Sequence, residues 1–237
     1  MTKLADSLHL KDLARPGQLK PTVVLISATV LLAAHRHFGT PAFWDRHAPF
    51  TGGIADPLYM FLSAFLLLGL IPFAIVRWGF HEDVRDYGLR LGDWRLGLRL
   101  VAFLFPLICV LMLLPAVWNP EIRLFYPMAP DLAGSASGFA LLEIPRTLFF
   151  YVAWEFFFRG FLLFGLRPII GDWMAICVQV VPSCLWHIGL PSGELFAAIA
   201  GGILFGVMAL RTRSIVWPIV LHALIGIGLD FMIVISR

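Results

Sequence analysis

The feature that most constrains this chain is a series of seven apolar runs, each close to the length that crosses a lipid bilayer. The runs cover residues 21–38, 57–76, 98–118, 141–166, 173–190, 195–210 and 215–235. A membrane-spanning helix needs about 20 predominantly apolar residues. Because lipid offers no partners for backbone N–H and C=O groups, only helices or closed barrels can span it. The sequence therefore predicts an all-α, polytopic membrane helix bundle with about seven transmembrane helices.

The composition supports the same class of protein. Of the 237 residues, 59% are hydrophobic and 14% are charged, and the mean hydropathy is +0.85. Soluble domains average about 25% charged residues, so the composition argues against a water-soluble fold. The net charge is only +3, which gives little electrostatic basis for binding nucleic acid. We therefore expect membrane lipid, and no nucleic acid, as a partner.

The distribution of Lys and Arg predicts the orientation of the chain. With a cytoplasmic N-terminus, twelve Lys and Arg residues lie in cytoplasmic segments and four in outer segments. Because cytoplasmic loops carry such an excess, we expect a multi-pass protein of the cell (inner) membrane with its N-terminus in the cytoplasm. Residues 1–20 would form a cytoplasmic segment, and residues 21–237 one integral-membrane domain. Residues 80–98 alternate charge with Leu and Trp and could add an eighth element, an amphipathic helix along the interface.

A pair of ionisable residues lies deep in the fourth apolar run. Glu155 and Arg159 are four positions apart and therefore share one face of a helix. Each charge costs about 2.5–3.5 kcal/mol at the centre of a membrane helix, and pairing offsets part of this cost. Two interpretations are open: a salt bridge that sets helix packing, or a carboxylate that takes part in chemistry.

Three further ionisable residues lie in the later apolar runs. His187 is near the end of the fifth run, His222 lies in the seventh, and Asp230 follows eight residues later on the same run. A glutamate with two histidines suits two chemistries. Glu155, His187 and His222 could bind zinc, as His₂Glu sites do. Alternatively, Glu155 could act as general base on a water while the histidines polarise a carbonyl or stabilise an oxyanion.

Three segments together resemble the CPBP family. This family comprises CAAX-type prenyl endopeptidases and bacteriocin-processing or immunity proteins, also called glutamic-type intramembrane proteases. The segments are Glu155–Leu162 (EFFFRGFL), His187 at the end of its apolar run, and Arg211–Leu224 (RTRSIVWPIVLHAL). Upstream, Asp86–Arg90 (DYGLR) is similar to the segment before the family's core. The core resemblance covers about residues 140–235.

The family pattern is Glu-Glu-x-x-x-Arg, then Phe-x-x-x-His, then His-x-x-x-Asn, and this chain departs from it at three positions. Aligned on Arg159, the retained Glu155 is the second glutamate, and Trp154 stands in place of the first. Ser183 replaces the Phe, and Gly226 replaces the Asn. Both histidines and the Glu-Arg pair are present.

The resemblance implies an intramembrane endopeptidase that hydrolyses a peptide bond in a membrane-associated protein. The substrate would be a CAAX-like, leader or sorting-signal protein or peptide. Glu155 would be the general base, the histidines would bind the water or the oxyanion, and Arg159 would position Glu155. The expected site residues are catalytic Glu155, His187 and His222 with supporting Arg159, Asp230 and Trp154. The resemblance favours a metal-free site, with zinc at the three catalytic residues as the alternative.

Two other functions stay open from the sequence. The first is a non-catalytic binding or immunity protein of the CPBP fold, in which the Glu-Arg pair is structural and the histidines line a docking cavity. The second is a transporter, whose charged residues would line a path between the leaflets. The sequence has no evident inverted repeat to support a transporter.

Overall fold

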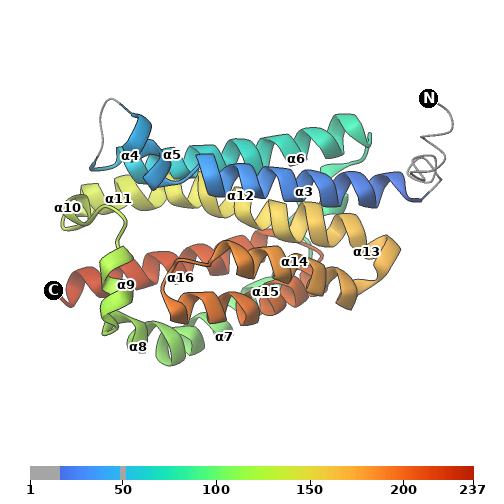
Figure 1. Ribbon diagram of the computed structural model, residues 1–237. Helices are drawn as coiled ribbons and strands as arrows, with labels where there is room; N and C mark the ends of the chain where they lie inside the picture. Colours follow the sequence, from blue (N-terminus) through green and yellow to red (C-terminus); the bar gives the residue numbers. More distant parts are fainter. Residues whose placement is uncertain (1–16, 49–51) are drawn as a thin grey trace.

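The computed structural model describes residues 17–48 and 52–237, which form a bundle of helices (Figure 1). Six of these helices are long and apolar enough to cross a bilayer. The described residues contain no β-strand, and Ile188 and Leu190 form an isolated bridge. The predicted all-α membrane bundle is therefore confirmed. Of the expected cytoplasmic segment, residues 1–16 lie outside the described residues, and the first long helix begins at Leu19.

Several of the long helices join α-helical and π-helical segments end to end. The first is α3 (Leu19–Phe38). The second joins α5 (Ala55–Ala64), η1 (Phe65–Leu70), α6 (Ile71–Ala74) and η2 (Ile75–Gly79). The third joins α7 (Trp94–Ile108), η4 (Cys109–Leu113) and α8 (Leu114–Val117). The fourth, which we call the central helix, joins α11 (Ala136–Pro145), η5 (Arg146–Tyr151), α12 (Val152–Glu155), η6 (Phe156–Phe164) and α13 (Gly165–Ile170). The last two are α15 (Ser192–Thr212) and α16 (Val216–Ile235).

The shorter elements connect or flank these helices. They are α4 (Pro41–His47), the 3₁₀-helix η3 (Val84–Tyr87), α9 (Pro120–Phe125), α10 (Pro130–Ala133) and α14 (Asp172–Trp186). The fifth predicted span corresponds to α14, which has only 15 residues. At about 1.5 Å per residue it is shorter than the roughly 30 Å hydrocarbon core. The expected seven spans thus become six long helices and one apolar helix too short to cross unaided.

The alternative of an amphipathic helix over residues 80–98 is wrong. Before α7 begins, this segment contains only the single turn η3. Between η3 and α7, backbone groups form hydrogen bonds with the connection between α15 and α16. The N–H of Ile215 donates to the carbonyl of Gly88 (2.9 Å), and the N–H of Asp93 donates to the carbonyl of Thr212 (2.8 Å). Gly88 has a positive φ of 85°, which an α-helix does not permit. Tertiary hydrogen bonds therefore replace the helical ladder in this segment.

The central helix forms the core of the bundle. Within its most apolar window 78% of the residues are buried, against 17–33% for the other five long helices. α3, η1 and α14 pack against it from different sides, and α15 and α16 also contact it. Figure 1 shows α14, α15 and α16 together along one side of this helix. Polar side chains on that side of the central helix can therefore meet residues of these three helices away from lipid.

Candidate active site

Glu155 lies in the core and joins two helices. Its side chain is fully buried, and its Oε1 atom accepts hydrogen bonds from Nη1 of Arg159 (3.1 Å) and Nδ1 of His222 (2.6 Å). Arg159 lies one turn along the central helix, whereas His222 comes from α16. The structure thus brings three of the residues singled out in the sequence into direct contact.

The Glu155–Arg159 ion pair leaves two buried atoms unsatisfied. Oε2 of Glu155 and Nε of Arg159 are buried and have no hydrogen-bond partner among the described residues. The guanidinium also lies over the ring of Phe205, 5.2 Å from its centroid. A buried charge in lipid is stable only when it is paired, so each member of the pair depends on the other.

The two histidines are oriented by the hydrogen bonds of their Nδ1 atoms. Nδ1 of His222 bonds to the Glu155 carboxylate, and Nδ1 of His187 lies 2.7 Å from the carbonyl oxygen of Ser183. Both partners are acceptors, so the hydrogen-bond pattern assigns the proton of each neutral ring to Nδ1. Nε2 of each ring is then an unprotonated acceptor. The change from Phe to Ser at position 183 does not affect this bond, because the backbone carbonyl makes it.

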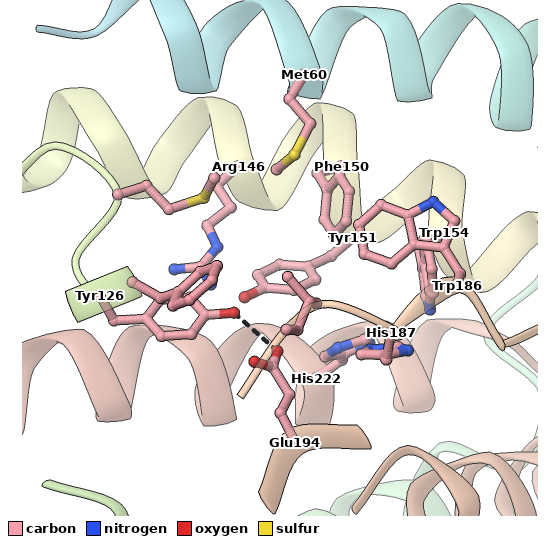
Figure 2. Close-up of a pocket in the computed structure, with 13 residues that line it drawn as sticks. Met60, Tyr126, Arg146, Phe150, Tyr151, Trp154, Trp186, His187, Glu194 and His222 are labelled. Atoms are coloured by element: carbon pink, nitrogen blue, oxygen red, sulfur yellow. Dashed lines mark hydrogen bonds between the residues drawn. The ribbon is translucent and has the colours of Figure 1, made fainter. Parts of the chain in front are cut away.

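Both histidines line one cavity of about 110 Å³ (Figure 2). Two adjoining cavities of about 230 and 390 Å³ also have His222 in their walls. Glu155 lines none of these three cavities. Of the three expected catalytic residues, His187 and His222 therefore line the cavity. Glu155 does not, and it contacts His222 on the side away from the cavity.

Trp154, in the place of the family's first glutamate, belongs to a cluster of aromatic rings. It is 2% exposed and stacks on Phe150, with ring centroids 5.4 Å apart and an interplanar angle of 23°. Its ring also meets those of Trp186 (4.9 Å) and His187 (5.8 Å) edge-on. An indole in this position packs the wall of the cavity but supplies no carboxylate.

Asp230 belongs to a separate ionic cluster. Nη1 of Arg146 bonds to Oδ2 of Asp230 (2.9 Å) and to Oε1 of Glu143 (3.3 Å), and all three side chains are buried. Arg146 lines the cavity, but the two carboxylates do not. The expectation that Asp230 supports the Glu155 site is thus not matched by a hydrogen bond or ion pair to Glu155 or to a histidine among the described residues.

The sequence does not indicate a place for Glu194 and Tyr126 at this cavity. Glu194 lies in the first turn of α15, and its Oε1 accepts a hydrogen bond from the Tyr126 hydroxyl (2.8 Å; Figure 2). Burial, and next the nearby carboxylate, raises the pKa of Tyr126 well above its usual range, so this hydroxyl stays protonated. A glutamate in a first helical turn is ordinary, because it interacts favourably with the helix dipole. The sequence therefore carries no signal that separates Glu194 from a residue at a helix end.

Tyr151 is a further residue that the sequence did not indicate. It is 2% exposed, and its ring lies 4.6 Å from that of His222. It lines the 110 Å³ and 390 Å³ cavities, and its hydroxyl makes no hydrogen bond within the described part of the chain. The tyrosine is one of many aromatic residues in an apolar run, where it is indistinguishable from a packing residue.

The zinc alternative has no geometric support. In the two described ranges, no three His, Cys, Asp or Glu side chains lie close enough together to hold a metal ion. Glu155 and His222 hydrogen-bond to each other directly at 2.6 Å, which leaves no room for an ion between these two atoms.

Comparison with known proteins gives one match, to a family model over part of the chain. Residues 136–227 match a family model described as Rce1-like, type II CAAX prenyl endopeptidase Rce1-like. No curated protein and no solved structure matches the chain. The matched range contains the central helix and extends into α16, so it holds Glu155, Arg159, His187, Glu194 and His222, whereas Tyr126 and Asp230 lie outside it.

The buried ion pair makes a specific prediction about stability. Glu155→Gln leaves the Arg159 charge unpaired in the core, which is expected to cost about 3–5 kcal/mol. The double variant Glu155→Gln/Arg159→Gln removes both charges and should recover most of that loss. Thermal unfolding of the purified protein in detergent measures both. As a control, Asp172→Asn breaks the exposed pair with Arg167 (2.9 Å) and should cost less than about 1 kcal/mol. Equal losses in the two Glu155 variants would contradict a mutually dependent pair.

Proposed function

The chain carries an Rce1-like domain of the CPBP family at residues 136–227, and from this premise we propose that it is an intramembrane endopeptidase. The reaction is hydrolysis of a peptide bond in a membrane-associated protein. The observation that carries the proposal is the Glu155–His222 hydrogen bond of 2.6 Å, which joins a fully buried carboxylate to an imidazole at the wall of the cavity. A carboxylate that orients an imidazole is a recurring element of hydrolytic sites.

In this proposal the two histidines hold the water. Their Nε2 atoms are acceptors, and a cavity of about 110 Å³ exceeds the roughly 10–15 Å³ that one water requires. Glu155 acts through His222, because its Oε1 atom is engaged by His222 and Arg159 and its side chain lines none of the three cavities described above. Glu155 is thus a positioning residue that fixes the tautomer and the orientation of His222. The sequence-based role of Glu155 as direct general base is not favoured by this geometry.

A binding or immunity protein of the same fold is the second candidate. It is favoured by Trp154, which fills the place of the family's first glutamate with an indole. In this case the cavity would receive a segment of a partner protein without cleaving it. The two candidates share the fold, and they differ in whether a peptide bound in the cavity is hydrolysed.

Peptide hydrolysis by the purified protein separates these two candidates. The full-length protein is reconstituted in liposomes with a pool of membrane-anchored peptides. Some peptides end in a farnesylated CAAX sequence and others carry an N-terminal leader segment, and mass spectrometry detects the products. The wild-type protein should cleave at least one class. His222→Gln should lower kcat by about 100-fold or more.

The folded variant Glu155→Gln/Arg159→Gln tests the positioning role of Glu155. It should lose kcat with little change in KM, since the substrate cavity is intact but His222 is no longer fixed by a carboxylate. Wild-type kcat in this variant would overturn the role of Glu155. Absence of cleavage of any peptide by the wild-type protein would instead favour the binding function.

We also propose a cell-membrane location with the N-terminus in the cytoplasm, on the basis of the excess of Lys and Arg in the corresponding segments. In this orientation the α14–α15 connection and the α9–α10 region face the outer side. Phe125, Tyr126, Met128 and Leu190 of these segments line the cavity, so the cavity lies toward that side. This arrangement favours leader or sorting-signal substrates on the outer side over cytoplasmic prenylated proteins.

Cysteine labelling tests this orientation. The native cysteines, which are Cys109, Cys177 and Cys184, are first replaced by Ala. In intact cells, a membrane-impermeant maleimide should then label Leu124→Cys in the outer α9 segment and leave Arg211→Cys at the cytoplasmic end of α15 unlabelled. Both side chains are exposed, so accessibility to the reagent depends on the side of the membrane. The opposite labelling pattern would reverse the orientation and the preferred substrate class.

A further inference from the structure

Glu194 is the one carboxylate that the described residues place in the wall of the cavity. It lines each of the three cavities described above, and no other Asp or Glu among the residues described lines any of these three. Resting on the proposed function, we propose that Glu194 is the general base that activates the water. The family's motif glutamate would then be replaced by a residue from another helix.

The contacts of Glu194 suit a general base. Its Oε1 is fixed by the Tyr126 hydroxyl at 2.8 Å, whereas Oε2 is buried and has no hydrogen-bond partner in the described part of the chain. Figure 2 shows the side chain extending from α15 toward Tyr126, in the cavity that His187 and His222 also line. One oxygen is therefore held in place, and the other is free to accept a hydrogen bond from water.

The alternatives to Glu194 are each engaged elsewhere. Glu155 lines none of these three cavities, and Glu143 and Asp230 are paired with Arg146. A base must lie within hydrogen-bond reach of the proton that it takes, so access decides between these carboxylates. Access favours Glu194.

The proposed step is balanced in atoms and electrons. Water gives a proton to Oε2 of Glu194 while its oxygen bonds to the carbonyl carbon, and the π electrons of the carbonyl move to its oxygen. When the tetrahedral intermediate collapses, the C–N bond breaks and Glu194 returns the proton to the leaving nitrogen. The products are a carboxylic acid and an amine, and Glu194 is restored.

The test uses the liposome assay with Glu194→Gln, which keeps the shape and the acceptor for Tyr126 but removes the base. We expect kcat to fall by about 100-fold or more, with KM within a few-fold and thermal stability retained. Glu121→Gln is the matched control. Glu121 accepts from the backbone and hydroxyl of Ser192 at the same helix end (both 3.3 Å) but lies outside the three cavities, so this variant should keep wild-type kcat.

Chemical rescue distinguishes a catalytic role from a structural one. Added formate should restore part of the activity of Glu194→Ala, because it supplies a carboxylate in the vacated space. Wild-type kcat in Glu194→Gln, with Glu155→Gln/Arg159→Gln inactive, would overturn this inference and leave the proposed function standing. If Glu194→Gln and Glu194→Ala both lose activity and formate does not restore it, the inference is likewise overturned and the proposed function stands. A wild-type protein that cleaves none of the peptides would overturn the proposed function and this inference together.

A different observation carries a second inference, about Tyr151. A Cβ atom built on Gly226 would lie 1.8 Å from the Tyr151 hydroxyl oxygen. The phenol thus occupies the space that a side chain at position 226 would need, one turn after His222. Its hydroxyl is a donor without a partner in the described chain and lies at the cavity. We infer that Tyr151 donates a hydrogen bond to the carbonyl oxygen of the substrate as negative charge develops there.

Tyr151→Phe tests this role because it removes only the oxygen. Loss of one donor to an oxyanion typically lowers kcat by about 100- to 1000-fold, and we expect a loss in this range with KM and thermal stability nearly unchanged.

Moving the donor from position 151 to position 226 provides the control. Gly226→Asn alone should be destabilised by the clash, whereas Tyr151→Leu/Gly226→Asn should exceed Tyr151→Leu in kcat because an amide donor returns. Wild-type kcat in Tyr151→Phe would overturn the inference.

Discussion

The structure of this site depends on keeping one carboxylate charged in the core of a membrane bundle. Glu155 is fully buried, and its charge is tolerable only because Arg159 and His222 both bond to the same oxygen. Arg159 satisfies the charge within the central helix, and His222 ties that helix to α16. The hydrogen bond that stabilises the carboxylate also fixes the imidazole at the cavity wall. Packing and the chemistry of the site therefore share one interaction.

The features that could be predicted from the sequence are those encoded locally. Hydropathy over windows of about 20 residues identifies spanning helices because the bilayer imposes the length, and the structure has a helix for each predicted run. The four-residue spacing of Glu155 and Arg159 predicts their contact because it is a property of one helix. The two histidines stand out in the sequence because an ionisable ring in an apolar run is costly. Their cavity then follows from α14 and α16 packing beside the central helix.

The features that could not be predicted depend on contacts between segments distant in sequence. Residues 80–98 have the composition of an interfacial helix, but their backbone bonds to residues 212 and 215. The sequence predicts that Glu155 meets water, whereas in the structure Glu155 lines none of the three cavities and bonds to His222 at the cavity wall. Glu194 and Tyr151 resemble an ordinary helix-end acid and an ordinary packing ring until α15 and the central helix are placed together. No local pattern reports which side of a buried residue faces a cavity.

The three departures from the family pattern take on different meanings once they are placed in space. The change from Phe to Ser at position 183 leaves the orientation of His187 intact, because the backbone carbonyl of residue 183 makes the hydrogen bond. Trp154 fills its surroundings with aromatic contacts, so a carboxylate could serve the cavity only from another element, and α15 supplies one in Glu194. Gly226 leaves room that the Tyr151 hydroxyl takes. A motif records which positions usually supply a base and a donor, but hydrolysis requires only that these groups reach the same water and carbonyl. Whether a chain with these departures can be active therefore depends on the residues that line the cavity. These still include a carboxylate (Glu194), two histidines and a hydroxyl donor (Tyr151).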